Sequence, residues 1–446
     1  MPAWQLKQWL HEFSFVMVPK VLGGGSTFVL NILLFRFFTP EQYGAYSLCI
    51  AGILLAEGIF GSAIDLAVLR LAPLCRTENP SRSQAIQQAG LHIKLVLIGI
   101  FFLLSGIFAV PLRRILFSNK GEVSWLYLTT AAILGVLVLR SVQTHFQVEG
   151  KFSAYGKVEL LHIFAKFSGV AIAILIGRVN PGLILAFFAA APIGIATLFF
   201  IFYGQDFFRG KDQLSIPLIM EMVHFMKWFL ITTGISVVVA QLPNFTLTRW
   251  AGIREVGIYS AGSALASIFP MLGLYLSVLL SPRIMSFYRQ GKIYSLYRIL
   301  QRILIAGSVV IYLFFFLYID FIARKLFPPS FSASKEIFMV LLPSALSWLA
   351  TTPLNMTFVL FLRPKFIISV ESVVFPFLLL SYYWVIPAHG ASGAAWVTMI
   401  FGLIRSGIIQ LAAWRWARKP PVAGDFRMIA PEDSLIPASL PERVGW

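Results

Sequence analysis

The chain contains a series of long apolar stretches, most of them close to or above the length of about 20 residues that a membrane-crossing helix needs. Charged residues make up 12% of the 446 residues, about half of the roughly 25% that soluble domains carry. The stretches do not alternate between apolar and polar residues, as the short strands of a membrane barrel do. Because lipid offers the backbone no hydrogen-bond partners, each stretch must form a helix. The sequence therefore predicts an all-α polytopic membrane protein.

Twelve transmembrane helices are predicted from the apolar stretches. Those at 125–146 and 158–177 carry the weakest signal because both contain several polar residues. The twelve predicted spans are about 13–38, 45–71, 91–111, 125–146, 158–177, 183–203, 222–248, 257–281, 301–322, 336–362, 366–386 and 393–414.

A weak internal repeat links the two halves of the chain. With an offset of 213 residues, Asn31 falls on Asn244 and Gly44 falls on Gly257 without any gap. The same offset pairs Arg36 with Arg249, Tyr46 with Tyr259, Ser47 with Ser260, Arg70 with Arg283 and Gly177 with Gly390. Such matches indicate a duplication of the kind found in transporters with parallel repeats.

The duplication predicts two lobes of six helices each. Because six is an even number, both lobes keep the same orientation, and their pseudo-twofold axis runs along the membrane normal. We expect an amphipathic N-terminal segment at 1–12, an N-lobe at 13–204, a polar cytoplasmic linker at 205–221 and a C-lobe at 222–414. The Pro-rich remainder, 415–446, is expected to be a disordered cytoplasmic tail.

Lys and Arg residues in the predicted loops indicate the orientation. With the N-terminus inside, roughly twice as many of them fall on the cytoplasmic side as outside, as the positive-inside rule requires. Lys94, at the start of the third span, is counted with the cytoplasmic group. Both termini are therefore expected in the cytoplasm.

The net charge of +17 does not indicate nucleic-acid binding, because the basic residues are scattered over short loops rather than clustered on one face. They are typical of topology signals and contacts with anionic lipid headgroups. Cys49 and Cys75 lie about 39 Å apart if their span is one helix, too far for a disulfide. Neither cysteine has the spacing of a metal site, and no cofactor or metal is expected.

Polar residues inside the apolar spans are the candidate functional residues, because a charge at mid-bilayer costs about 2.5–3.5 kcal/mol and usually faces a cavity or a partner. Helical spacing places Lys20 and Asn31 on one face of the first span, and Glu159 and Lys166 on one face of the fifth. The substrate-binding candidates are Lys20, Asn31, Arg140, Gln143, Lys166, Gln241, Asn244 and Arg405. The ion-coupling candidates are Glu57, Asp65, Glu159 and Glu371.

Each candidate also has a structural interpretation. Glu159 and Lys166 are spaced to pair within one helix, Lys20 is close enough to the interface to extend toward headgroups, and Asp65 is able to form a local network with Arg70. His162 is more typical of a packing residue than of a proton carrier. The aligned polar faces of several spans nevertheless favour a polar central cavity.

Three short sequence motifs resemble those of a known family. Arg36-x-x-Thr39-Pro40-Glu41-Gln42-Tyr43-Gly44-Ala45-Tyr46-Ser47, followed by Gly61-x-x-x-Asp65-x-x-x-x-Arg70, resembles the start of Wzx-type polysaccharide flippases. These flippases belong to the multidrug/oligosaccharidyl-lipid/polysaccharide (MOP) superfamily. Pro387-x-x-Gly390-x-x-Gly393-Ala394-Ala395 resembles the turn before a late helix of the same family.

The resemblance implies a V-shaped pair of six-helix bundles around a central cavity. It also implies that the protein flips a polyprenyl-diphosphate-linked oligosaccharide across the bacterial inner membrane by alternating access. The oligosaccharide would be a repeat unit of O-antigen, exopolysaccharide or capsule. A diphosphate suits the cations Lys20, Arg140, Lys166 and Arg405, because Arg and Lys give it charge-assisted hydrogen bonds. The expected partners are the lipid-linked substrate, membrane lipids, and polysaccharide polymerase and export machinery.

Two other functions remain open at this stage. A MATE-like drug or cation antiporter shares the twelve-helix plan, but it favours acidic cavity residues. A membrane glycan polymerase or ligase is also polytopic, but such enzymes usually carry a sizeable outer loop, and the longest one here is the segment around 112–124. We therefore expect a transporter and not an enzyme.

Overall fold

The computed structural model describes residues 3–76, 79–117, 122–208, 215–289, 293–361 and 364–418. All regular elements in these ranges are helical. Those of the first half are α1 (Ala3–Phe37), α2 (Pro40–Ala56), the π-helix η1 (Glu57–Ser62), α3 (Ala63–Cys75), α4 (Pro80–Ile107), α5 (Ala109–Phe117), α6 (Val123–Val148), α7 (Phe152–Leu175) and α8 (Pro181–Phe208). Those of the second half are α9 (Ile216–Trp250), α10 (Ile253–Ala266), α11 (Ile268–Arg289), α12 (Ile293–Leu326), the 3₁₀-helix η2 (Pro329–Phe331), α13 (Ser334–Phe361) and α14 (Pro364–Ala417).

The helices provide twelve crossings, which confirms the predicted all-α polytopic fold. Ten helical stretches of the described residues are long and apolar enough to cross a membrane. One of them, Ile368–Arg415, has 48 residues and is interrupted at Gly390, where φ is 52° and ψ is −134°, so it holds two crossings. α13 supplies the remaining one. Only glycine adopts this backbone conformation without strain, so the break is encoded locally.

The second crossing of each half is interrupted near its middle. In the first half, α2 passes into η1 and then into α3. In the second half, α10 ends at Ala266 and α11 begins at Ile268, two residues before Pro270. A short π-helical stretch inside an α-helix interrupts the regular backbone hydrogen-bond pattern, and such stretches are frequent at functional sites. Glu57 is the first residue of η1.

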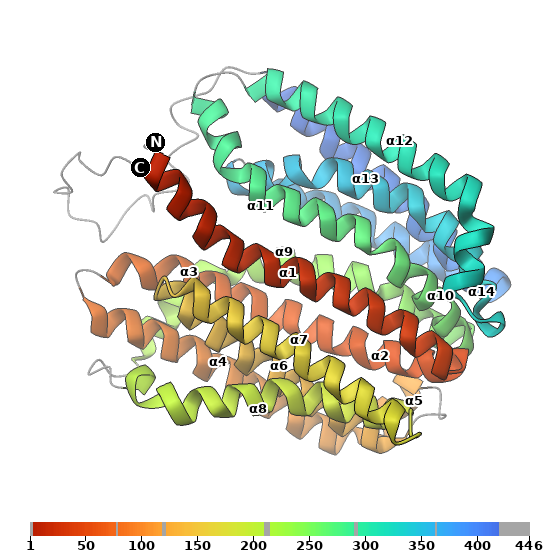
Figure 1. Ribbon diagram of the computed structural model, residues 1–446, viewed down its shortest axis with the longest axis horizontal. Helices are drawn as coiled ribbons and strands as arrows, with labels where there is room; N and C mark the ends of the chain where they lie inside the picture. Colours follow the sequence, from red (N-terminus) through yellow and green to blue (C-terminus); the bar gives the residue numbers. More distant parts are fainter. Residues whose placement is uncertain are drawn as a thin grey trace.

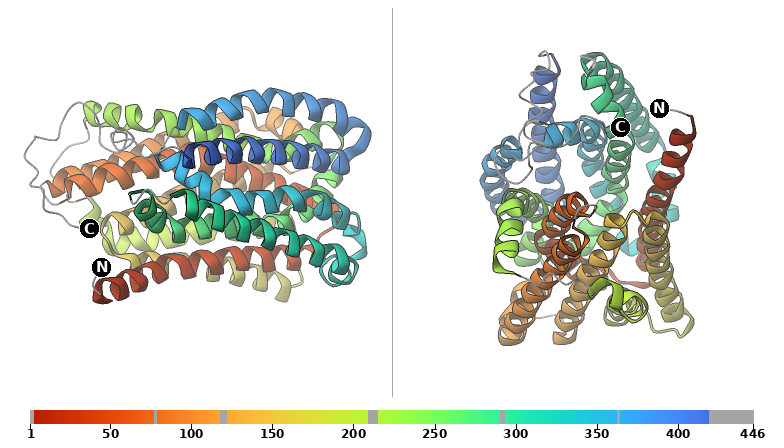
Figure 2. Two further views of the ribbon diagram at one scale, coloured as in Figure 1. Left: turned by 90° about the horizontal axis from the view of Figure 1, so that it is seen from above. Right: turned by 90° about the vertical axis from the view of Figure 1, so that its left-hand side faces the viewer.

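Two groups of helices lie side by side, one from each half of the chain (Figure 1). α1 and α9, the first helices of the two halves, run along the boundary between the groups (Figures 1 and 2). We call the end of the bundle where α1 begins the near end. The far end is where α1 stops at Phe37 and α2 starts at Pro40.

Symmetry-related residues meet at the far end. Gly44 packs so closely on α10 that a Cβ on Gly44 would lie 2.1 Å from the Ile253 carbonyl oxygen. Likewise, a Cβ on Gly257 would lie 1.9 Å from the Pro40 carbonyl oxygen. The 213-residue offset converts each contact into the other, because it pairs Gly44 with Gly257 and Pro40 with Ile253. Glu41 and Arg254, another pair of that offset, form an ion pair of 3.7 Å. The pseudo-twofold axis therefore passes between α2 and α10.

The offset also relates two contacts between the halves, one on each side of the axis. Met271 of α11 fills the space beside Gly24 of α1, and Val237 of α9 fills the space beside Gly58 of η1. Residue 24 corresponds to 237, and 58 corresponds to 271. Gly24 lies on the first crossing of the first half, and Gly58 lies on the second crossing. Small residues let helices approach closely in lipid, where packing rather than water exclusion drives association.

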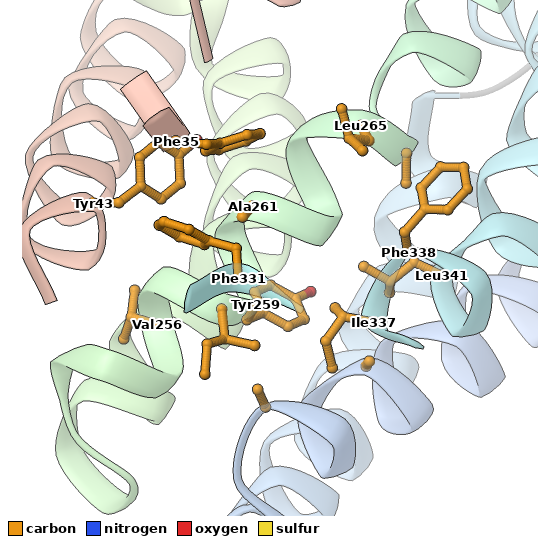
Figure 3. Close-up of a cluster of buried hydrophobic side chains, with 14 of the residues drawn as sticks. Phe35, Tyr43, Val256, Tyr259, Ala261, Leu265, Phe331, Ile337, Phe338 and Leu341 are labelled. Carbon is orange, nitrogen blue, oxygen red and sulfur yellow. The ribbon is translucent and has the colours of Figure 1, made fainter. Parts of the chain in front are cut away.

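The large hydrophobic core lies at the far end and includes both halves. Phe35 and Tyr43 pack against Phe331 of η2 with ring centroids 5.4 and 5.9 Å apart (Figure 3). A smaller core at the near end joins Ala63 and Ile64 of α3 to Met222 and Met226 of α9.

The sequence of α2 explains how its start is fixed. Thr39 accepts a hydrogen bond from the Gln42 backbone amide at 3.3 Å, and the Gln42 side chain accepts one from the Thr39 amide at 3.0 Å. This is a capping box, with Pro40 at the first helical position and Glu41 near the positive end of the helix dipole. The cap positions Tyr43 and Gly44 at the axis.

Candidate functional site

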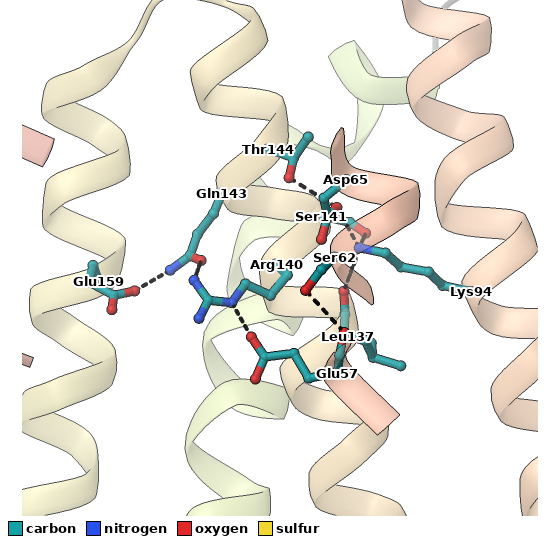
Figure 4. Close-up of polar contacts among 10 residues, drawn as sticks. All are labelled: Glu57, Ser62, Asp65, Lys94, Leu137, Arg140, Ser141, Gln143, Thr144 and Glu159. Carbon is teal, nitrogen blue, oxygen red and sulfur yellow. Dashed lines mark hydrogen bonds and ion pairs between the residues drawn. The ribbon is translucent and has the colours of Figure 1, made fainter. Parts of the chain in front are cut away.

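A chain of polar contacts inside the first half links three crossings (Figure 4). Arg140 of α6 donates from Nε to Glu57 Oε1 at 2.8 Å and from a terminal nitrogen to Gln143 Oε1 at 3.1 Å. Gln143 in turn donates from Nε2 to Glu159 of α7. The predicted residues Glu57, Arg140, Gln143 and Glu159 are therefore brought together, although η1, α6 and α7 supply them separately.

Lys20 of α1 and Lys166 of α7 complete this group, which we call the N-lobe cluster. Glu159 and Arg140 are charged neighbours of both lysines. Among the described ion pairs, neither lysine has a carboxylate partner, and the Lys166 ammonium lies 5.1 Å from the centroid of the Phe188 ring. With formal charges, Arg140, Lys20 and Lys166 outnumber Glu57 and Glu159 by one. The cluster therefore has an excess positive charge.

His162 adds an unused polar atom to α7 near the same group. Its Nε2 is buried and has no hydrogen-bond partner among the described residues. Its charged neighbours are Lys166 and Arg140. An unpaired nitrogen in a helix bundle is costly unless another group reaches it.

The N-lobe cluster borders the seam between α1 and α11. The Tyr275 hydroxyl of α11 donates a hydrogen bond of 2.5 Å to the Lys20 carbonyl oxygen. A Cβ on Gly23 would lie 3.7 Å from Glu159 Oε1, so that carboxylate faces α1. The cluster is thus built by helices of the first half, contacts α11 of the second, and is partly exposed, since 42% of the Arg140 side chain is accessible.

Asp65 belongs to a separate, more buried network. Lys94 of α4 forms an ion pair of 2.6 Å with Asp65 and also donates to Ser141 Oγ at 3.0 Å, while Thr144 donates to Asp65 at 3.0 Å (Figure 4). The Lys94 side chain is 1% exposed. Sequence reasoning counted Lys94 as a loop cation because it lies at the start of an apolar run, and it therefore missed this partner. An acidic residue 29 positions away offered no helical spacing that would reveal the pair.

The second half holds its own ion pair. Glu371 and Arg405, on the two arms of α14, contact each other, with side chains 1% and 14% exposed. The Arg405 guanidinium lies 4.5 Å from the centroid of the Trp348 ring. Glu371 Oε2 has no hydrogen-bond partner among the described residues. Both charges of this pair are already compensated.

The other three predicted amide side chains lie nearer the far end and are engaged locally. Asn31 accepts a hydrogen bond of 3.2 Å from the Tyr43 hydroxyl. Asn244 donates to Gln241 at 3.1 Å and accepts from Ser260 at 3.1 Å. The structure therefore distributes the twelve predicted residues over several networks, of which the N-lobe cluster is the largest.

The described residues contain no group of three or more His, Cys, Asp or Glu side chains able to hold a metal ion. What the N-lobe cluster offers instead is an excess of cationic and hydrogen-bonding groups in apolar surroundings. In low dielectric such groups bind anions through charge-assisted hydrogen bonds.

Comparisons with known proteins agree on one class. A family model described as "Polysaccharide biosynthesis protein" matches residues 10–288. The succinoglycan biosynthesis transport protein ExoT of Rhizobium meliloti (strain 1021) is 21% identical over 248 residues, which are 55% of this chain. The matched part spans 47% of ExoT, about half of its length.

Solved transporters share the fold. A structure of the lipid II flippase MurJ in an inward closed conformation aligns with a TM-score of 0.74 at 12% identity, covering 93% of this chain and 89% of that one. The Vibrio cholerae MATE transporter VcmN aligns with a TM-score of 0.65 at 13% identity, covering 91% and 96%. At these identities the likeness concerns the fold alone.

Proposed function

Because the chain belongs to the polysaccharide biosynthesis protein family, a membrane transporter family of the MOP superfamily, we propose that it flips a polyprenyl-diphosphate-linked oligosaccharide by alternating access. The oligosaccharide is a repeat unit of O-antigen, exopolysaccharide or capsule. The membrane is the bacterial inner membrane, with both termini in the cytoplasm. The protein acts as a transporter rather than an enzyme, and hands its cargo to polymerase and export machinery.

The observation that carries this proposal is the excess positive charge of the N-lobe cluster. Lys20 and Lys166 lack carboxylate partners among the described residues, whereas Arg140 and Arg405 are paired with Glu57 and Glu371. The two lysines therefore bind the diphosphate, and Arg140 holds Glu57 and Gln143 in place beside them. The saccharide crosses between the two lobes, where amide side chains such as Gln143 and Gln241 reach its hydroxyl groups.

Of the four carboxylates considered for ion coupling, Glu159 fits this role best. Glu57, Asp65 and Glu371 each form an ion pair with a basic side chain. Among the described residues, Glu159 accepts a hydrogen bond from the Gln143 amide and has no basic partner within ion-pair distance, and it faces α1 near Gly23. A carboxylate without a fixed counter-ion is able to exchange its partner when the substrate diphosphate arrives.

The excess of cations disfavours the antiporter alternative. A cationic drug would be repelled by a cluster that already carries an extra positive charge, because like charges in low dielectric interact strongly. The two functions also differ in what accumulates when the protein is missing. Loss of a flippase leaves lipid-linked saccharide on the cytoplasmic leaflet, and loss of a drug antiporter does not.

The test uses a deletion strain without a redundant flippase. Deletion should cause lipid-linked saccharide to accumulate on the inner leaflet, and normal surface glycan in that strain would contradict the proposed function. Lys20→Ala and Lys166→Ala should each reduce export by at least about tenfold, since a charged hydrogen bond contributes about 1.5–3 kcal/mol. The conservative variants Lys20→Arg and Lys166→Arg should retain part of the export. Lys227 is an exposed lysine of α9. Its variant Lys227→Ala is the matched control and should leave export unchanged.

A further inference from the structure

An apolar pocket of about 580 Å³ lies between α1, α12 and the helices α10, α11 and α13. Its volume is in the range of about 300–1,000 Å³ typical of small-molecule sites. Every side chain of its wall is aliphatic or aromatic, among them Phe28, Leu272, Ile311 and Phe327. Leu265 and Phe338 of the same wall are drawn in Figure 3.

The pocket is open toward lipid on the side of α12. Val310 and Phe314 belong to its wall and are 66% and 50% exposed. Water gains no hydrogen bonds in such a wall, and an empty space would forfeit the dispersion contacts of its lining. A hydrocarbon chain from the membrane is therefore the occupant that the chemistry selects.

The pocket borders the interface between the lobes. Phe327 lines it and also contacts Phe35 of α1, with ring centroids 5.6 Å apart. It also lies close to the N-lobe cluster. Phe28 follows Lys20 by eight residues on α1, a rise of about 12 Å. Leu272 lies three residues before Tyr275, which hydrogen-bonds the Lys20 carbonyl oxygen.

This placement distinguishes two sources of a hydrocarbon chain. A phospholipid keeps its headgroup at the membrane surface, so its chain has no reason to start beside Lys20. A lipid whose diphosphate is bound at Lys20 and Lys166 has its first chain units at the crossing of α1 and α11. The branched methyl groups of an isoprenoid chain suit a wall that contains the rings of Phe28, Phe269 and Phe314.

We propose that this pocket holds the first isoprene units of the polyprenyl chain while the headgroup occupies the N-lobe cluster. The proposal rests on the proposed function and adds a tail subsite to it. The chain enters the pocket along the crossing of α1 and α11 and contacts Phe327, a residue of the interface between the lobes. Through its contact with Phe327, the polyprenyl chain directly affects how the two lobes pack at the far end.

The test uses the full-length protein in phosphatidylcholine nanodiscs with a polyprenyl diphosphate that carries a diazirine near its diphosphate. Photolabelled peptides are identified by mass spectrometry. Leu272→Trp and Val310→Trp fill the pocket from two helices. The matched controls are Leu274→Trp and Val309→Trp, which are neighbouring residues of similar exposure (Leu272 41%, Leu274 43%) outside the wall.

Labelling should fall on α1, α11 and α12 of the pocket. It should drop at least about tenfold in the two filled variants, because lost burial of only two methylene groups of an isoprene unit accounts for about that change, and stay unchanged in the controls. Labelling that is confined to other helices, or that both filled variants retain, would overturn the subsite. Equal competition by excess phosphatidylglycerol would show an ordinary lipid site and overturn it as well.

The cellular assay separates this subsite from the function itself. If the pocket proposal fails while deletion still causes lipid-linked saccharide to accumulate, the flippase function stands without this subsite. If labelling of the pocket occurs but deletion causes no accumulation, the lipid is bound for another purpose and the flippase function fails.

Discussion

At the scale of single residues, pairing decides what each intramembrane charge is able to do. Lys94 is 1% exposed and bound to Asp65, and Arg405 is bound to Glu371, so these four charges are compensated within the bundle. Lys20 and Lys166 lack such partners among the described ion pairs. All of these residues look equivalent in sequence, because each is a charge in an apolar run.

The Lys94–Asp65 pair is predicted to stabilise the fold. Lys94→Ala leaves the Asp65 carboxylate without its cation and should lower the unfolding free energy by about 3–5 kcal/mol, measured by thermal unfolding in detergent. Lys94→Met combined with Asp65→Leu should recover most of this loss. Lys335→Ala breaks an exposed ion pair of 2.9 Å with Asp320 and should change little. A Lys94→Ala protein as stable as the native one would contradict the assignment.

At the scale of helices, contacts between glycines and backbone determine how the two halves meet. α2 and α10 approach at Gly44 and Gly257 more closely than any larger residue allows. The break inside α14 depends on Gly390 and on Glu255, whose Oε2 accepts a hydrogen bond of 2.9 Å from the Ala391 amide at the start of the next arm. The carboxylate also interacts favourably with the positive end of that arm's dipole.

Gly44→Ala should loosen the far end of the bundle. The added Cβ would lie 2.1 Å from the Ile253 carbonyl oxygen, so α2 and α10 must separate. Cys49 of α2 is 2% exposed in the far-end core and reports the separation. In a Cys75→Ser background, its labelling by a water-soluble maleimide should accelerate about tenfold, since overpacking costs about 1–3 kcal/mol.

Gly194→Ala is the matched control for this experiment. A Cβ on Gly194 meets no atom within 4 Å, so Cys49 should label at the native rate. If Gly44→Ala also leaves the labelling rate unchanged, the α2–α10 contact does not seal the far end.

At the scale of the whole molecule, the two halves are packed at both ends but in different ways. At the far end the core includes helices of both halves and surrounds the axis. At the near end, α9 is attached to α3 and α4 by Met222 and Met226 and by an ion pair of 3.1 Å between Arg82 and Glu221. Among the side chains that the structure describes, α1 contacts the second half in its middle through Met271 and Tyr275 and at the far end through Phe35, which packs against Phe327 and Phe331. The proposed alternating access requires the far-end contacts to separate during each cycle.

A reversible bridge across the axis should therefore stop export. Glu41→Cys combined with Arg254→Cys places two thiols where an ion pair of 3.7 Å joins the lobes. A short, reducible bis-thiol reagent should block export in vesicles, and a reductant should restore it. Arg76→Cys with Glu149→Cys replaces an ion pair of 3.4 Å within the first lobe and should tolerate the same bridge. Export that continues with 41 and 254 bridged would rule out separation of the far end.

The sequence by itself determined the class of fold and much of its detail. Apolar length fixes where helices cross the membrane, Thr39-Pro40-Glu41-Gln42 fixes the start of α2, and Gly390 fixes a break, because each acts through local backbone chemistry. The duplication indicated which residues are equivalent. It did not reveal that Gly44 and Gly257 touch, because a repeat in sequence does not show where its symmetry axis passes.

Only the tertiary structure decided which charges are partners and which remain available. Glu57, Arg140 and Glu159 come from three crossings, and Lys94 meets Asp65 from a fourth, so no spacing along one helix encodes these contacts. The apolar pocket beside α12 was equally hidden, because its wall residues are the same Leu, Ile, Val and Phe that face lipid elsewhere. Local chemistry sets the helices, whereas the packing of distant helices sets the environment of each charge.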